Sequence, residues 1–162
     1  AAGVMILIQR PFRVGEAITA GTVTGTVRSI GLFTTELLQF DGVFVMVPNN
    51  ELWNKPIFNT SRMPTRRFEL LIGIGYGDSI EQARSELLAL ADAEQRVLND
   101  PAPVVFVSAL ADSAVTLGMR VWCKSEDYLG VSWALTEAAK KRFAEVGITI
   151  PFPQREVRAV PA

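Results

Sequence analysis

The residue types that carry out most covalent catalysis are scarce in this chain. Its 162 residues include no histidine and a single cysteine, Cys123, so the commonest general base and the usual metal ligands are missing. Asp112 and Asp127 have no histidine or second acidic residue at a catalytic spacing, and we interpret both as turn or cap residues. The alternating glycines of residues 73–77 lack the spacing and the lysine of a phosphate-binding loop. We therefore expect no catalytic residue, no cofactor and no metal site.

Arginines that follow directly on an apolar segment could instead bind anionic lipid. Residues 1–8, AAGVMILI, are apolar, and Arg10 and Arg13 come shortly after them. A helix needs about 20 residues to cross a bilayer, so we expect residues 1–8 to be the tail of a longer membrane helix. Positive charge at such an end marks the cytoplasmic side of a membrane. The alternative is an ordinary amphipathic start of a soluble domain.

Bulk composition narrows the class of protein further. Hydrophobic residues make up 49% of the chain and charged residues 20%, which indicates surface that partners or lipid bury. The net charge of −1 gives no electrostatic basis for binding nucleic acid. A single cysteine excludes an internal disulfide and fits a reducing compartment. We expect an oligomer that does not bind nucleic acid.

Short β segments separated by glycines follow the apolar start. They predict a small β domain over residues 14–61, with strands within residues 17–19, 21–30, 32–40 and 43–47. The dipeptide Asp41-Gly42 predicts a tight hairpin in which both residues have positive φ. Gly15 predicts a turn, and Pro48-Asn49 predicts another, because proline ends a strand and asparagine tolerates left-handed backbone.

The pattern then changes to that of an α/β domain over residues 62–150, after a polar connector at residues 60–67. Its elements are a strand at 68–74, a helix from Ile80 to about Leu98, strands at 104–107 and 115–121, a helix at 128–145 and a strand from Thr149. Ser79 and Gln82 have the form of a capping box at the first helix, and Gly147 is a natural end for the second. This order is the split βαβ arrangement of ferredoxin-like folds.

The last segment, residues 151–162, alternates imperfectly between apolar and polar residues and contains prolines, which suit an edge strand. One chain alone could not pair such a strand. Parallel strands from several chains could close into a barrel without a free edge, which is a physical reason for oligomerisation.

The sequence resembles the small-conductance mechanosensitive channel family, the MscS-like channels, over nearly its whole length. Each motif that carries the resemblance is weak alone, but their order and spacing are specific. The motifs are Arg10-Pro11-Phe12-Arg13-x-Gly15-Glu16, Gly25-Thr26-Val27, Val47-Pro48-Asn49, Asn59-x-Ser61-Arg62, Arg66-Arg67-x-Glu69, Tyr76-x-Asp78 and Gly147-Ile148-x-Ile150-Pro151-Phe152-Pro153-Gln154.

The resemblance implies an α+β fold assembled as a heptameric cage. Each chain would contribute the C-terminal end of a pore-lining transmembrane helix (residues 1–13), a Sm-like β domain, a ferredoxin-like α/β domain and a C-terminal barrel-forming strand. The implied protein is a channel of the bacterial inner membrane, opened directly by membrane tension, that releases ions and small solutes on hypo-osmotic shock. This part would be cytoplasmic and form the pore exit and vestibule, and its partners would be the other copies of a homo-heptamer, membrane lipids and the permeating solutes.

The resemblance also implies roles for single residues. Gly3 would be a hinge of the pore helix, although a small packing residue is the alternative. Arg10, Phe12 and Arg13 would lie at the membrane interface, where the arginines contact anionic lipid or form salt bridges within the heptamer. Glu69 would lie near a side portal of the cage and influence which ions pass. The alternative for Glu69 is a surface ion pair with the neighbouring arginines.

The chain departs from the family pattern at residues 17–24, which contain no acidic residue although members often carry one there. The ion preference of the vestibule therefore stays open. A different class of function is a soluble Sm-like or ferredoxin-like module that binds a ligand or RNA. The net charge, the lack of histidine and the lack of interleaved aromatic and basic residues count against it.

Overall fold

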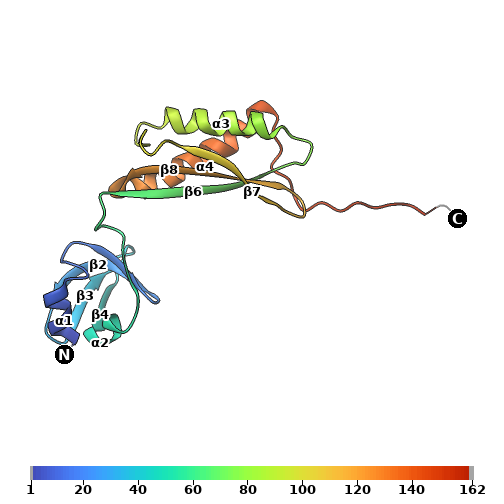
Figure 1. Ribbon diagram of the computed structural model, residues 1–162. Coiled ribbons are helices and arrows are strands. Elements are labelled where there is room, and N and C mark those ends of the chain that lie inside the picture. Colours follow the sequence, from blue (N-terminus) through green and yellow to red (C-terminus); the bar gives the residue numbers. More distant parts are fainter. Residues whose placement is uncertain (1, 161–162) are drawn as a thin grey trace. The chain divides into compact units, whose positions relative to one another are not determined.

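The chain divides into two compact units, Ala1–Pro64 and Thr65–Ala162, which we call unit 1 and unit 2. The structure is a computed structural model and describes residues 2–160 (Figure 1). Within that range no helix combines the length and the apolar character that crossing a membrane requires.

Unit 1 is a five-stranded antiparallel sheet with two short helices. Its strands lie in the order β4-β3-β2-β1-β5, so β4 and β5 are the two edges. Its elements are α1 (Ala2–Gln9), β1 (Ala17–Ala20), β2 (Val23–Ile30), β3 (Thr34–Leu38), β4 (Phe44–Pro48), α2 (Asn49–Trp53) and β5 (Ile57–Asn59). Its buried apolar side chains are Ile6, Phe12, Ile18, Ala20, Val27, Leu37, Val47 and Leu52. Helix α1 thus contributes to the core through Ile6, and the predicted β domain is confirmed as a sheet.

The hairpin between β3 and β4 differs in detail from the expectation. The Gln39 amide donates to the Val43 carbonyl, and the Gly42 amide donates to the Gln39 carbonyl. Gly42 has a φ of +85°, whereas Asp41 does not have positive φ. The turn therefore spans residues 40–42 and ends on a left-handed glycine, the common three-residue hairpin form. Asp41 can stay right-handed in this turn, and its carboxylate accepts the Val43 amide at 3.2 Å.

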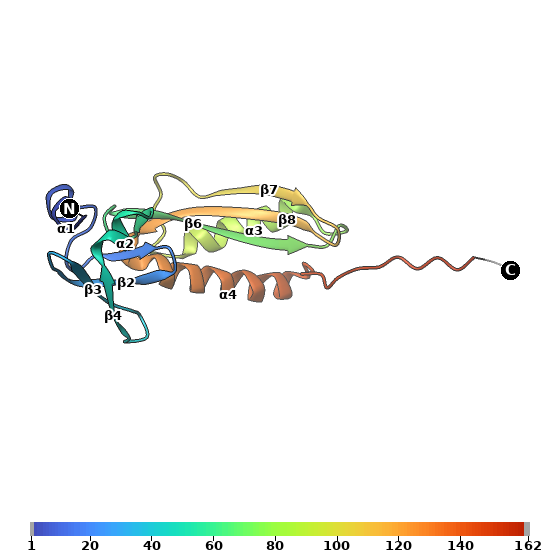
Figure 2. The same cartoon turned by 90° about the horizontal axis from the view of Figure 1, so that it is seen from below.

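Unit 2 is a three-stranded antiparallel sheet, in the order β6-β8-β7, with both long helices on one face (Figures 1 and 2). Its elements are β6 (Thr65–Ile74), α3 (Ile80–Ala93), β7 (Val104–Leu110), β8 (Val115–Lys124), a 3-10 turn η1 (Ser125–Asp127) and α4 (Tyr128–Val146). Its buried core includes Leu70, Ile74, Leu87, Leu117, Met119, Leu135 and Phe143. The expected order of strand, helix, two strands and helix is confirmed. Strand β6 begins at Thr65, so two arginines assigned to the connector lie in the strand.

The start of α3 and the end of α4 follow the predicted signals. Ser79 accepts the Gln82 amide at 3.2 Å and caps α3, and Gly147 ends α4 with a φ of +77°. Helix α3 stops at Ala93, however, and not near Leu98. The Leu98 amide donates to the Trp122 carbonyl, and Val97 bridges to β8. These apolar residues fit the helical pattern, but they belong to an extended segment that pairs with the central strand β8.

The expected last strand does not form within the single chain. None of residues 147–160 is in a strand, and residues 152–160 are exposed. Thr149 is nevertheless held at both backbone groups: its carbonyl accepts the Gly75 amide, and its amide donates to the Asp78 carboxylate at 2.9 Å. The Gln154 amide donates to the Ser113 hydroxyl. A barrel strand takes its partners from other chains, so the barrel stays a prediction, and residues 161 and 162 of that segment lie outside the described range.

Candidate functional site

Helix α1 packs against the rest of unit 1 at a glycine. Gly3 and Ile6 are the buried residues of the helix. A methyl group on Gly3 would lie 1.8 Å from the Leu32 carbonyl oxygen and 2.7 Å from the Asn49 amide nitrogen. The structure therefore gives Gly3 a packing role, the alternative to a hinge. The opposite side of the helix leaves Val4, Met5, Leu7 and Ile8 exposed.

Asn49 is the second residue, besides Leu32, against which Gly3 packs. Its side chain is buried, accepts the Thr35 hydroxyl at 2.7 Å and donates to the Gly31 carbonyl at 2.8 Å. Its backbone amide donates to the Phe33 carbonyl. Asn49 does not have positive φ, so the expectation of left-handed backbone at this residue is wrong. It is instead the first residue of α2, directly after Pro48 ends β4, and it fixes the loop against which α1 packs.

The end of α1 turns sharply into the sheet. Arg10 has a φ of +48°, and its amide still donates to the Ile6 carbonyl at 2.9 Å. Phe12 is completely buried in the core of unit 1, so the expectation that Phe12 faces the membrane interface is wrong. It is buried because the turn after Arg10 directs it into the sheet. Gly15 has a φ of +93°, a backbone conformation that favours glycine.

A network of polar contacts around Glu16 fixes this turn. Arg62 donates to both carboxylate oxygens of Glu16 at 2.9 Å, and its Nη2 also donates to the Arg10 carbonyl at 3.1 Å. The same carboxylate accepts the Arg13 amide and the Asn59 side chain, each at 2.7 Å. The hydrogen bond from Arg62 is the largest of the effects that lower the pKa of Glu16 to about 2. The sequence motifs contain these residues, but their pairing comes only from the fold.

Arg10 and Arg13 lie together beside the exposed side of α1. Both line a hollow of about 400 Å³, which Ile6, Leu7, Phe12, Val14 and Ile30 also line. In the described part of the chain no acidic side chain forms an ion pair with either guanidinium. Two cations therefore adjoin an apolar hollow and an apolar helix face, which is suitable chemistry for the headgroup region of an anionic lipid.

Glu69 lies on β6, directly opposite Arg120 of β8. The Arg120 Nε and Glu69 Oε1 atoms are 2.5 Å apart. Glu69 thus forms a surface ion pair, as in the alternative given above, but its partner is Arg120 and not Arg66 or Arg67; the portal stays a prediction. Arg66 instead places its guanidinium carbon 3.7 Å from the ring centroid of Tyr128.

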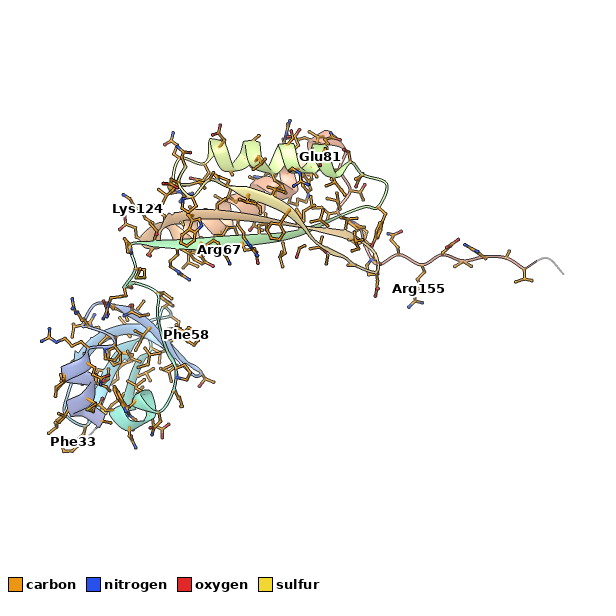
Figure 3. The ribbon with its side chains drawn as sticks, viewed as in Figure 1. Phe33, Phe58, Arg67, Glu81, Lys124 and Arg155 are labelled. Atoms are coloured by element: carbon orange, nitrogen blue, oxygen red, sulfur yellow. The ribbon has the colours of Figure 1, made fainter. Side chains whose placement is uncertain are left out.

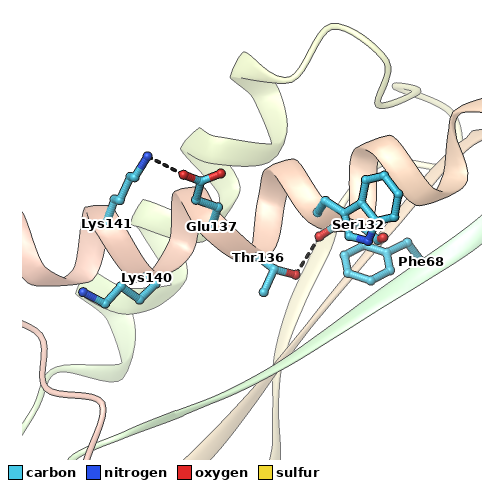
Figure 4. A pocket seen from close by; sticks show the side chains of 7 residues that line it. Phe68, Ser132, Thr136, Glu137, Lys140 and Lys141 are labelled. Atoms are coloured by element: carbon cyan, nitrogen blue, oxygen red, sulfur yellow. Dashed lines mark hydrogen bonds and ion pairs between the residues drawn. The ribbon is translucent and has the colours of Figure 1, made fainter.

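A second hollow and the single cysteine are further candidates for a site within residues 2–160. An open hollow of about 590 Å³ along α4 is lined by residues such as Trp133. Two of its side chains form bonds within the helix. Lys141 pairs with Glu137, and the Thr136 hydroxyl donates to the Ser132 carbonyl (Figure 4). Burial raises the pKa of the Cys123 thiol, which disfavours the reactive thiolate. Among residues 2–160 no three His, Cys, Asp or Glu side chains lie where they could hold a metal ion.

Comparisons with known proteins match both units. The family model described as "Mechanosensitive ion channel, beta-domain" matches residues 1–62. The model described as "Mechanosensitive ion channel MscS, C-terminal" matches residues 68–150. The chain is 38% identical over 160 residues to an uncharacterised MscS family protein of Synechocystis, covering 99% of this chain and 54% of that protein. It is 36% identical over 157 residues to a small-conductance mechanosensitive channel of Edwardsiella ictaluri, covering 97% and 55%.

Solved structures agree with the sequence comparisons. The closed-state crystal structure of MscS from Helicobacter pylori superposes with a TM-score of 0.91 at 26% identity, covering 99% of this chain and 64% of that one. The Arabidopsis thaliana MSL1 structure gives a TM-score of 0.75 at 26% identity, covering 94% and 57%. The chain thus spans about half the length of the curated relatives it matches.

Proposed function

Since this chain belongs to the MscS family of mechanosensitive ion channels, we propose that it is the pore exit and cytoplasmic vestibule of a channel opened directly by membrane tension. The observation that carries the proposal is the docking of a short apolar helix, α1, onto a β unit of the family type while its outer face stays exposed. Such a helix end can transmit a change in the membrane to the vestibule. An open state that occupies more membrane area becomes more populated as tension rises.

The channel is proposed to be a homo-heptamer. Exposed apolar side chains on unit 1, among them Phe33 and Phe58, support burial against further copies (Figure 3). Both edges of the unit 1 sheet, β4 and β5, are open in the single chain. Residues 151–162 would pair with the same segment of other copies, which satisfies backbone groups that one chain leaves exposed. The number seven rests on the family resemblance alone.

The membrane boundary is proposed to lie at Arg10 and Arg13, in a bacterial inner membrane with both units on the cytoplasmic side. Their contact with an apolar hollow supports a role in binding anionic lipid headgroups. The hinge is proposed to lie at Gly3, the point at which α1 packs closely against Leu32 and Asn49. Glu69 is proposed to line a side portal through which ions and small solutes reach the pore.

Pressure-step recording from excised patches tests the proposal. The full-length protein is expressed in a host without mechanosensitive channels of its own, and its insertion is verified by membrane fractionation. Discrete openings that depend on suction and persist in protein-free solution are the expected result. Silence of inserted protein would contradict the channel and favour another role for the two units, such as binding a ligand. Native mass spectrometry of the detergent-solubilised protein tests the heptamer separately.

A further inference from the structure

One face of the unit 2 sheet carries an interlocked set of three side chains from three strands. Helices α3 and α4 cover the other face, where Phe68, Leu70, Met119 and Val121 are buried with them. Because side chains alternate along a strand, Glu69 and Arg120 point to the helix-free face. They are paired directly across β6 and β8. Both residues of the pair therefore lie within hydrogen-bonded strands and not on loops.

Arg120 is also fixed from its other side. Its guanidinium carbon lies 4.5 Å from the ring centroid of Phe106, on β7, which is a favourable cation–π distance. Phe106 in turn lies opposite Gly118, where an added methyl group would be 2.4 Å from the ring. Because Gly118 has no side chain, the Phe106 ring can occupy this space. The ring then contacts the Arg120 guanidinium while that group pairs with Glu69.

From this geometry we infer that Arg120 determines ion specificity by neutralising Glu69 on the surface that permeating ions pass. The inference rests on the proposed function, which places Glu69 at a portal. A carboxylate at such a wall attracts cations and repels anions. With Arg120 2.5 Å away, the pair itself has no net charge and acts on a passing ion as a dipole. Ion preference at this position therefore depends on the pair and not on Glu69 alone.

Two single substitutions and their combination test the inference. Arg120→Gln leaves Glu69 uncompensated and is expected to shift the reversal potential in a salt gradient toward cations. Glu69→Gln leaves Arg120 uncompensated and is expected to shift it toward anions. The permeability ratio should change about twofold in each case, since salt screens charges at a wet wall. The double variant should return close to the wild-type value, because both charges are gone.

The matched control is Lys141→Gln, which removes one positive charge from α4, where Lys141 pairs with Glu137. It should leave the reversal potential unchanged. The recordings use excised patches with the full-length protein, and variants are compared only where they open under suction. Channels that open but keep the wild-type reversal potential in both single variants would overturn the inference alone. A wild type that stays silent would overturn the proposed function, and this inference with it.

Discussion

The carboxylate of Glu16 and the guanidinium of Arg62, 46 residues apart in the sequence, meet in a two-pronged ion pair with both N–O distances at 2.9 Å. This pair joins the segment between α1 and β1 to the last residues of unit 1. Arg62 also donates to the carbonyl of Arg10, where the helix ends. The negative end of the helix dipole stabilises a positively charged guanidinium at this position. The position of α1 is therefore fixed at its C-terminal end by Glu16 and at its N-terminal end by Gly3.

Replacing Glu16 by glutamine should destabilise unit 1. The neutral side chain loses the charge-assisted bonds to Arg62 and to the Arg13 amide, and we expect a loss of about 1–2 kcal/mol in the free energy of unfolding. Exchange of the Arg13 amide with deuterium should become faster. The control is Glu51→Gln, which breaks only the exposed pair of Glu51 with Lys55 and should change little. Equal effects of the two variants would contradict a special role for Glu16.

The same residue predicts how the stability of unit 1 depends on pH. The pKa of Glu16 falls from 4.5 to about 2 in the folded chain, so its ionised form favours folding. That contribution is fully present above the unfolded value and is lost as pH falls toward the folded value. The stability difference between wild type and Glu16→Gln should thus be constant near neutral pH and shrink below about pH 4.5. Denaturant unfolding of both proteins at several pH values measures it; a difference that persists unchanged to pH 2 would contradict the assignment.

Replacing Gly3 by alanine separates a packing role from a hinge. Alanine favours an isolated helix by about 1 kcal/mol over glycine, so a hinge alone would become stiffer and the α1 amides would exchange more slowly. The added methyl group meets the Leu32 carbonyl at 1.8 Å, so we expect α1 to leave its seat and its amides to exchange faster. Ile8→Ala changes an exposed residue of the same helix and should leave exchange in residues 31–35 unaltered.

The sequence predicts much of this fold because its signals are local. Alternation along Val115–Val121, the cap at Ser79 and the left-handed Gly147 depend on neighbours within a few residues, and the structure has all three. The family motifs indicated the family whose models match residues 1–62 and 68–150. The pairing of Glu69 with Arg120 could not be predicted in the same way, because the partner is 51 residues away and closer arginines were available.

Burial in the turn after α1 was missed for a related reason. Phe12 stands between two arginines, and this local context favours a surface position. Only the positive φ of Arg10 and the contacts of Glu16 direct Phe12 into the core. Asn49 shows the same limit: its type indicates a turn, whereas the buried hydroxyl of Thr35, 14 residues away, makes it a hydrogen-bonding centre.

A double-mutant cycle on Asn49 and Thr35 tests whether this centre supports α1. Asn49→Ala leaves the buried Thr35 hydroxyl and the Gly31 carbonyl without their partner, and we expect a loss of about 2–3 kcal/mol in the free energy of unfolding of unit 1. Thr35→Val alone should cost less, because it removes only one of the two side-chain bonds of Asn49.

The double variant should lose less stability than the sum of the two single losses, because both single variants remove the same Thr35–Asn49 hydrogen bond. The matched control is Asn50→Ala, a change of the same residue type at an exposed neighbouring position, which should be nearly neutral. Hydrogen exchange of α1 provides the second measurement. Strictly additive losses, with α1 exchanging as slowly as in the wild type, would show that Asn49 stabilises the loop without holding the helix.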